Sequence, residues 1–411
     1  MTTAEAPFIA PRWRLPRWLI GLAAALLLWE LAARALAGTY LLAAPSEVAI
    51  YLWQNAGLMG RALAITSRDA ALGFIFGNLA ALALALVSVL LPRTERMISA
   101  LALLCFCLPL VATGPILRVL YGPGSGPQIT LAALAVYYTT YLPVMVGLRA
   151  APGSWFDLVR SYGRGRLTEL IEVRALASVP YLIAGLQIAA PAAFLGAMVG
   201  EFTGAERGMG VLAIRSMRAL DVPATWALAT VAATVSVVAY LAVGWLGRRL
   251  SFAPPVLILS AASAPRRRVR RNILPGLLTL GAITLTVLIL WHVSMEAFGL
   301  NRFFAKRPGD VWDFLVAAPD AVANRGTLFP ALGQTLAFTL PGYLAGLALG
   351  AGLAAGIVMV PRFASVILPV AIALRSVPII TTAPLIVLAL GRGAAGTITI
   401  VAVMIFFPTL V

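Results

Sequence analysis

The sequence predicts an all-α, polytopic membrane protein, and three observations support this fold class. The 411 residues are 61% apolar and 11% charged, with a mean hydropathy of +0.95, whereas soluble domains are nearer half apolar and a quarter charged. Apolar runs recur that are long enough to cross about 30 Å of hydrocarbon as helices of roughly 20 residues. The alternating pattern of a membrane barrel is not seen, so helices are expected to satisfy the backbone in lipid.

About ten spans are expected, near residues 18–37, 70–91, 97–120, 128–148, 178–200, 224–247, 273–293, 331–360, 363–390 and 395–411. The first run has an Arg-rich flank and ends near Ala35-Leu36-Ala37, which also resembles a secretory signal with its cleavage site. We interpret it as an internal span, because the run is long for a signal core and an equivalent run occurs later in the chain.

The formal charge of +16 comes from arginines in short clusters between the apolar runs, which favours membrane orientation over nucleic-acid binding. If the N-terminus is cytoplasmic, the cytoplasmic segments carry 18 of the 31 basic residues and five of the 15 acidic ones. Because basic residues gather on the cytoplasmic side, the sequence predicts a cytoplasmic N-terminus.

The chain contains a predicted internal duplication. A shift of 269 residues places 66–142 on 335–411 without a gap, and it matches Thr66 with Thr335, Gly73 with Gly342, Gly77 with Gly346, Pro92 with Pro361, Pro109 with Pro378, Pro115 with Pro384 and Gly122 with Gly391. A slightly smaller shift matches Trp29 with Trp291 and Pro45-Ser46-Glu47-Val48 with Pro308-Gly309-Asp310-Val311. Chance similarity of apolar runs does not align prolines and glycines in this way.

Three segments are therefore expected: a first unit over 1–250 with about six spans, a basic cytoplasmic linker over 251–272, and a second unit over 273–411 with about four spans. An even number of spans separates the two starts, so the units have the same orientation and enclose a path along the membrane normal. The linker is a solvated connection or a lipid-recognition site. The second unit stops at Val411, which aligns with Leu142 of the first unit. Either the sequence is a fragment, or the second unit has lost its last part.

A polar insert over 149–179, between the fourth and fifth spans, is too polar for lipid and too long for a turn. Asp157-Leu158-Val159 leads into Gly163, after which Leu167, Leu170 and Ile171 fall at helical spacing, opposite Arg166, Glu169 and Glu172. The pattern predicts two short helices hinged at the glycine. Such a module suits a groove on a soluble partner.

The insert resembles the coupling loop of bacterial binding-protein-dependent ABC importer permeases. That loop has Glu-Ala-Ala, three residues, Gly, nine residues and an Ile-x-Leu-Pro end. Here Asp157-Leu158-Val159, Gly163 and Val173–Leu176 occupy those places, with bulkier residues for the alanines and Leu176 for the proline.

A second resemblance is more specific. Gly200-Glu201-Phe202-Thr203-Gly204-Ala205, followed by Gly208-Met209-Gly210, is similar to the signature after the fifth span in the nitrate, taurine and alkanesulfonate permease subgroup. The segment Pro45-Ser46-Glu47-Val48 resembles the outer loop of the same subgroup. The resemblance covers the first unit and the second unit until it stops.

The resemblance implies a MetI-like permease in the bacterial inner membrane that is not an enzyme. The sequence has no Gly-x-x-x-x-Gly-Lys-Ser/Thr phosphate cradle and its only lysine is Lys306. We therefore expect no cofactor on this chain and ATP use by a separate cytoplasmic ABC ATPase subunit, expected as a dimer. The other implied partners are a periplasmic or lipid-anchored solute-binding protein and membrane lipids, with no nucleic acid. The implied cargo is a small anion such as nitrate, sulfonate, taurine or bicarbonate.

Several single residues in the predicted spans are candidates for function. Arg375 lies near the middle of the ninth span, where it contacts a transported anion, pairs with a backbone carbonyl, or marks a misplaced boundary. Four prolines either interrupt their helices along the path or form ordinary kinks: Pro109, Pro115, Pro378 and Pro384. Glu201, Glu30 and His292 lie at span ends, where they are interfacial caps or parts of an ion relay.

Two other classes of protein remain to be compared with the importer. A secondary transporter with parallel repeats also explains the duplication, but it usually needs buried acids for ion coupling, and the spans supply few. A membrane enzyme is less consistent with one histidine and no nucleophile–base or metal-ligand cluster.

Overall fold

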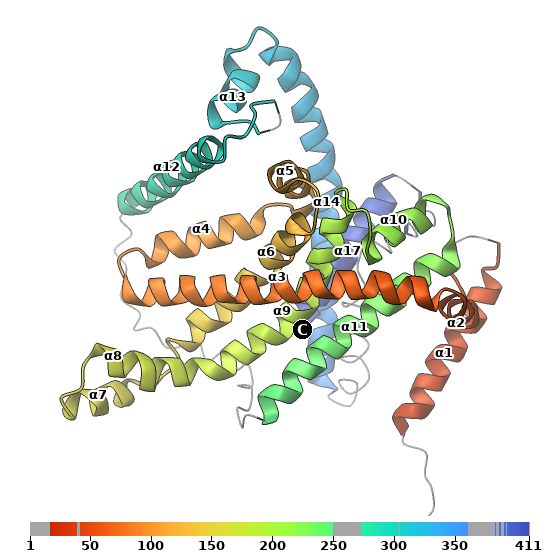
Figure 1. The fold of residues 1–411 in the computed structure, drawn as a ribbon, viewed down its shortest axis with the longest axis horizontal. Helices are drawn as coiled ribbons and strands as arrows, with labels where there is room; N and C mark the ends of the chain where they lie inside the picture. Colours follow the sequence, from red (N-terminus) through yellow and green to blue (C-terminus); the bar gives the residue numbers. More distant parts are fainter. Residues whose placement is uncertain are drawn as a thin grey trace, which may run out of the picture.

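The computed structural model describes residues 17–38, 42–249, 273–303, 305–360 and 393–410, together with positions 383, 386, 387, 390 and 391. All regular structure in these residues is helical (Figure 1). The helices are α1 (Arg17–Ala35), α2 (Pro45–Gln54), α3 (Ala56–Leu90), α4 (Glu95–Cys107), α5 (Leu110–Tyr121), α6 (Gly126–Gly147), α7 (Gly153–Ser161), α8 (Arg166–Thr168), the π-helical η1 (Glu169–Ala175), α9 (Leu176–Phe202), α10 (Met209–Arg218), α11 (Val222–Arg249), α12 (Ile273–Ala297), α13 (Pro308–Trp312), the π-helical η2 (Asp313–Ala317), α14 (Ala321–Met359) and α17 (Ala394–Leu410).

Six of these helices are long and apolar enough to cross a membrane: α3, α6, the continuous segment Arg166–Phe202, α11, the Leu280–Ala297 part of α12, and α14. They coincide with six of the ten expected spans. The bent pair α4–α5 raises the number to seven if it is one span. The helix α17, with 17 residues, is shorter than that criterion, and most of the expected span 363–390 lies outside the described residues.

The expected span over 97–120 consists of two helices, which agrees with the alternative in which Pro109 interrupts its helix. Helices α4 and α5 meet at an angle of 92° around Leu108 and Pro109. Leu108 is extended, at φ −64° and ψ 129°, which is the conformation that a following proline imposes on its neighbour. Pro109 also has no N–H to continue the helix, so the chain turns there and starts α5.

Small residues hold the body of the first half together around α6. A Cβ atom on Gly73 of α3 would lie 2.8 Å from the Ile129 carbonyl oxygen, and one on Gly77 would lie 2.6 Å from that of Ala133. The backbones of α3 and α6 are therefore in direct contact, which is how small residues stabilise helix pairs in lipid. Helix α9 packs against both α6 and α3, and α11 packs against α9.

The ends of these helices define two faces of the body. At one end, Ser88 near the end of α3 lies beside Tyr141 of α6, with 3.2 Å between their hydroxyl oxygens. At the other end, a Cβ on Gly200 of α9 would lie 2.6 Å from the Cα of Gln128, at the start of α6. Helix α9 thus runs antiparallel to α6, and the segment 149–179 and the residues after α9 lie at opposite ends.

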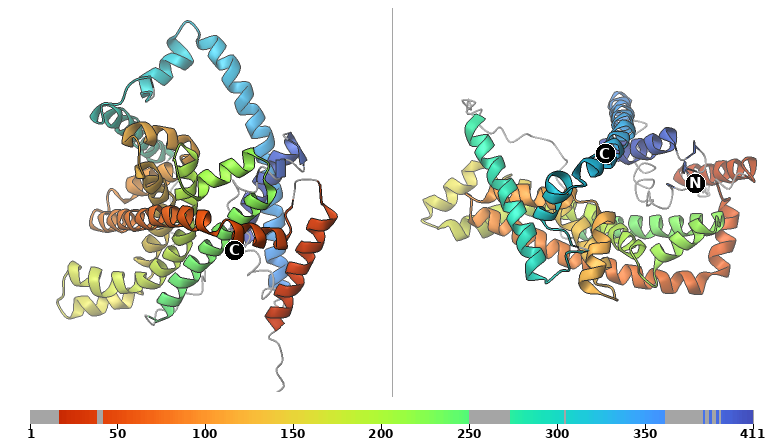
Figure 2. Two further views of the ribbon diagram at one scale, coloured as in Figure 1. Left: turned by 45° about the vertical axis from the view of Figure 1, so that its right-hand side comes forward. Right: turned by 90° about the horizontal axis from the view of Figure 1, so that it is seen from above.

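The second half repeats the α3–α6 contact in the pair α14–α17. A Cβ on Gly342 would lie 2.8 Å from the Ile398 carbonyl oxygen, and one on Gly346 would lie 2.5 Å from that of Ala402. Each of these four positions is the one that a shift of 269 residues assigns from the first half. Figure 2 shows α14 and α17 beside the α3–α11 body rather than within it.

The segments that follow α1 and α12 also match. The indole of Trp29 donates to the Ala43 carbonyl, and that of Trp291 donates to the Lys306 carbonyl, both at 3.0 Å. The carboxylate of Glu47 accepts from the Ala44 amide at 2.9 Å. That of Asp310 accepts from the Arg307 amide at 2.8 Å, which lowers the pKa of Asp310.

Candidate functional site

The insert 149–179 forms a helical hairpin that projects from one end of the body (Figure 1). Helix α7 ends at Ser161, and Gly163 turns the chain with a φ of +67°, its amide donating to the Arg160 carbonyl at 2.9 Å. Nothing lies within 4 Å of a Cβ placed on Gly163, so its dihedral angle, and not lack of space, requires glycine. The chain then returns through α8 and η1 into α9.

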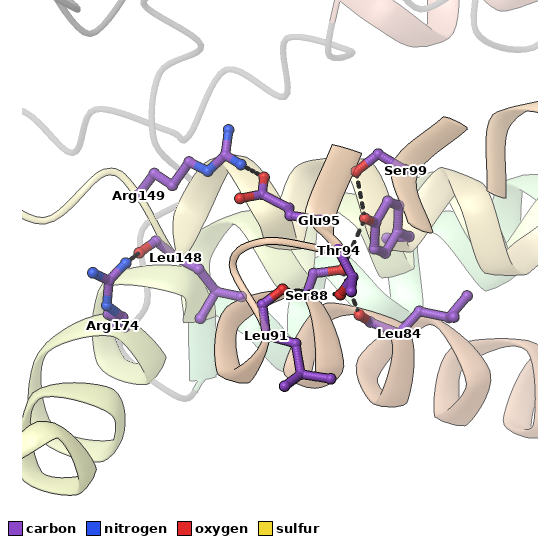
Figure 3. A network of polar contacts seen from close by, with 10 residues as sticks. Leu84, Ser88, Leu91, Thr94, Glu95, Ser99, Leu148, Arg149 and Arg174 are labelled. Atoms are coloured by element: carbon purple, nitrogen blue, oxygen red, sulfur yellow. Dashed lines mark hydrogen bonds and ion pairs between the residues drawn. The ribbon is translucent and has the colours of Figure 1, made fainter. Parts of the chain in front are cut away.

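Charged side chains close the hairpin and tie it to the body. Arg160 of α7 donates to the Glu169 carboxylate of η1 at 2.8 Å, across the turn. Arg174 donates to the Leu148 carbonyl at 3.2 Å and lies over the Phe156 ring. Figure 3 shows this arginine beside Leu148, and the ion pair between Arg149 and Glu95 at the start of α4.

Large apolar side chains are exposed on the hairpin. The most exposed are Leu167 at 68% and Tyr162 at 77%, and further exposed ones are Trp155, Leu158, Ile171 and Leu176. Leu167 and Ile171 are four residues apart, so they lie on one side of their helix. The hairpin projects from the body, is held by polar contacts and exposes apolar side chains. Such a surface is suited to a protein partner.

Glu201 is the central residue at the opposite end of α9, and it is 2% exposed. Its carboxylate accepts from the Thr66 hydroxyl of α3 at 2.6 Å and from the Gly210 amide of α10 at 2.5 Å. The Thr66 hydroxyl also accepts from the Met209 amide at 2.9 Å. The amides of Met209 and Gly210, at the start of α10, are thus capped by Thr66 of α3 and Glu201 of α9.

Glycines make this close approach possible. Gly208 has a φ of +132°, and a Cβ there would overlap the Glu201 carboxyl group. A Cβ on Gly210 would lie 2.5 Å from the Met198 carbonyl oxygen. Gly204, with a φ of +118°, turns the chain after α9, and Phe202 packs against the core there. The glycines of the signature therefore fit a short loop folded over a buried carboxylate.

The structure places the predicted site residues in separate groups. The coupling-loop set lies on the hairpin and consists of Asp157, Leu158, Val159, Gly163, Leu167, Leu170 and Ile171. The signature set lies at the far end of α9. Pro109 precedes α5 at the break, and Pro115 is inside α5. Arg375, Pro378 and Pro384 lie outside the described residues.

Two residues that organise these groups, Glu169 and Thr66, were not predicted as site residues from the sequence. Glu169 was expected on a charged side opposite the leucines, but its side chain is buried by the Arg160 pair. The sequence signal for this ion pair was the presence of opposite charges, Arg160 and Glu169, on either side of the Gly163 turn. The pairing of Thr66 with Glu201 joins residues 135 positions apart, and no local pattern predicts it.

Within the described residues, no group of three or more His, Cys, Asp or Glu side chains is arranged to hold a metal ion. The fold and these two groups of residues define a multi-pass helical membrane protein with a projecting hairpin at one end and a capped loop at the other. This is the architecture of a transport permease.

Comparison with known proteins agrees with this class. Residues 50–252 match the family described as the binding-protein-dependent transport system inner membrane component. A probable ABC transporter permease protein of Haemophilus influenzae is 30% identical over 214 residues, 51% of this chain and 86% of the relative. The chain belongs to this family of ABC transporter permeases.

Two further relatives have names that specify a cargo. The formylaminopyrimidine transport permease protein ThiX of Halalkalibacterium halodurans is 25% identical over 223 residues, 53% of this chain and 88% of the relative. The putative aliphatic sulfonates transport permease protein SsuC of Escherichia coli is 27% identical over 216 residues, 52% of this chain and 80% of the relative. The chain is thus the inner-membrane permease component of a binding-protein-dependent import system, and not an enzyme.

Proposed function

We propose that the hairpin 149–179 is the site where a cytoplasmic ABC ATPase subunit docks and drives the permease. The observation that carries this proposal is the set of exposed apolar side chains on a hairpin held by the Arg160–Glu169 and Arg174–Leu148 contacts. Rigid contacts at its base would transmit a movement of the hairpin to α9 and to the end of α6. ATP is bound and hydrolysed by the partner, expected as a dimer, and the spans then expose the path to either side in turn.

The proposed orientation places the hairpin and the N-terminus in the cytoplasm. The arginine excess on the hairpin side supports it, because basic residues are enriched in cytoplasmic loops. The Glu201 end of α9 then faces the periplasm, where a solute-binding protein, free or lipid-anchored, delivers the cargo.

We further propose that residues 273–411 belong to a second unit of the same type, joined to 1–250 through the segment 251–272. The matched glycine contacts of α3–α6 and α14–α17 support it, as do the matched indole bonds of Trp29 and Trp291. Two units with the same orientation would enclose one translocation path. Pro109 and Pro115, with Arg375, Pro378 and Pro384, stay proposed path residues.

For the cargo we propose a small anion such as nitrate, bicarbonate, taurine or another sulfonate. The likeness to a sulfonate permease supports this class. So does a cavity of about 250 Å³ at the proposed periplasmic end, lined by Arg61, Arg207 and Arg215 with one acid, Glu206. An excess of arginine at the entrance would attract anions.

The docking proposal is tested with Leu167→Gln, which removes an exposed apolar contact on the hairpin. We expect affinity for the ATPase subunit to fall roughly tenfold or more, because a buried leucine contributes about 1.5–3 kcal/mol. The control is Ile50→Gln, which changes an exposed apolar residue at the opposite end, on α2. Titration of the ATPase subunit onto permease in nanodiscs measures both, and equal affinities for the two variants would refute the docking site.

A further inference from the structure

A cavity of about 540 Å³ lies at the base of the hairpin, between it, the end of α3, the start of α4 and the end of α6. Its charged lining consists of Arg149, Arg160, Arg166, Arg174, Glu95 and Glu169. Four guanidinium groups and two carboxylates thus surround one space, which has an excess of positive charge.

The contacts within the lining leave part of this charge uncompensated. Arg149 pairs with Glu95, and Arg160 pairs with Glu169, so both carboxylates are used. Arg174 contacts a neutral carbonyl and an aromatic ring. The guanidinium of Arg166 makes no hydrogen bond or ion pair within the described part of the chain, and this residue is exposed. The two remaining guanidinium groups, Arg166 and Arg174, are able to hold an anion, and their planar donors match a phosphate.

The rest of the lining is apolar, with Val89, Leu90, Pro92, Met145 and Leu170 among its residues. The cavity also lies where the candidate spans α3 and α6 end and Arg166–Phe202 begins. In the proposed topology, that position is the boundary between hydrocarbon and water. A free phosphate would use only the arginine part of the wall, whereas a phospholipid would also fill the apolar part.

We propose that this cavity binds an anionic phospholipid, with its phosphate held by Arg166 and Arg174 and its glycerol region against Val89 and Met145. The bound lipid connects the hairpin to the turn between α3 and α4, so it braces the element that docks the ATPase. The bracing role rests on the proposed docking function, while lipid binding itself does not. Basic pockets at the cytoplasmic ends of helices attract anionic headgroups by this chemistry.

The test uses the full chain, delipidated in detergent, with phosphatidylglycerol added and bound lipid counted by native mass spectrometry. We expect one retained phosphatidylglycerol and weaker retention of phosphatidylcholine, which has no net charge. Arg166→Gln should weaken phosphatidylglycerol binding roughly tenfold, which is the loss of one charge-assisted contact. The matched control is Arg164→Gln, which removes an exposed arginine two residues away that does not line the cavity.

Three outcomes would overturn the proposal. The first is equal retention of phosphatidylglycerol and phosphatidylcholine, and the second is equal binding by the Arg166 and Arg164 variants. The third is displacement of the lipid by millimolar inorganic phosphate, which would make the cavity a free-anion site. The lipid measurement contains no ATPase subunit, so a negative lipid result would not bear on the docking proposal. In the same way, a negative docking result would not change the interpretation of lipid binding.

Discussion

The Glu201 carboxylate combines deep burial with two hydrogen bonds from different helices, Thr66 of α3 and Gly210 of α10. A buried group with this bonding is costly to remove, because each donor left without an acceptor costs about 1–3 kcal/mol. The sequence left capping and ion relay as alternatives for this residue. The geometry favours capping, because the oxygens accept from fixed backbone and hydroxyl donors.

The two roles of Glu201 are separated by a pair of variants. In Glu201→Gln the side-chain carbonyl still accepts from the Gly210 amide and the amide nitrogen can donate to Thr66, so we expect near-normal folding and transport. In Glu201→Ala the Gly210 amide loses its acceptor while the Thr66 hydroxyl keeps the Ala62 carbonyl, so we expect destabilisation by about 1–3 kcal/mol. Thermal unfolding in detergent and uptake in proteoliposomes measure the two effects.

The control for this pair is Glu206→Ala, which changes an exposed carboxylate in the same loop. It should unfold like the wild-type protein. A Glu201→Gln protein of normal stability that does not transport would show that the proton or charge of Glu201 is needed, and the capping role would be wrong.

At the scale of elements, the hairpin α7–α8 depends on one left-handed residue. Gly163 has a φ of +67°, whereas Gly165 has a φ of −90°, and a Cβ atom placed on either glycine would meet nothing within 4 Å. The two glycines therefore differ in dihedral angle and not in packing. They provide a matched test of whether the turn holds the two helices together.

We expect Gly163→Ala to destabilise the closed hairpin by about 1–2 kcal/mol, the cost of a left-handed conformation for an L-residue. Gly165→Ala should have little effect, because extended backbone suits alanine. Hydrogen exchange of the α7 amides measures the difference, with faster exchange expected only for the first variant. Identical exchange in both would mean that the Arg160–Glu169 contact alone closes the hairpin.

The positions of the long helices could be predicted from the sequence pattern. Hydropathy located α3, α6, α9 and α11, because a span needs a long apolar run and little else. At α4–α5 the apolar run continues through Pro109 although the helix does not, and the sequence left an interruption and an ordinary kink as alternatives there. The proline was visible in the sequence, but its effect depends on whether the next residues restart a helix in a new direction, which packing decides.

At the scale of the whole molecule, the repeated glycines were predictable from self-comparison, and their contacts are found in the structure. Gly73 with Ile129 and Gly342 with Ile398 form the same close approach. The pairing of Thr66 with Glu201 was not predictable, because it joins two helices whose relative position follows from the fold. The same holds for the cavity around Arg166, which combines four segments.

The proposed transport mechanism depends on the hairpin being on the cytoplasmic side and covered by a separate ATPase subunit. Leu167→Cys provides the reporter, in a background where the exposed native Cys105 and Cys107 are replaced by serine. The measurement is labelling by a membrane-impermeant maleimide in right-side-out and inside-out vesicles, with and without the ATPase subunit. We predict labelling only in inside-out vesicles and strong protection when the ATPase subunit is bound. Labelling in right-side-out vesicles, or equal labelling with and without the subunit, would contradict this mechanism.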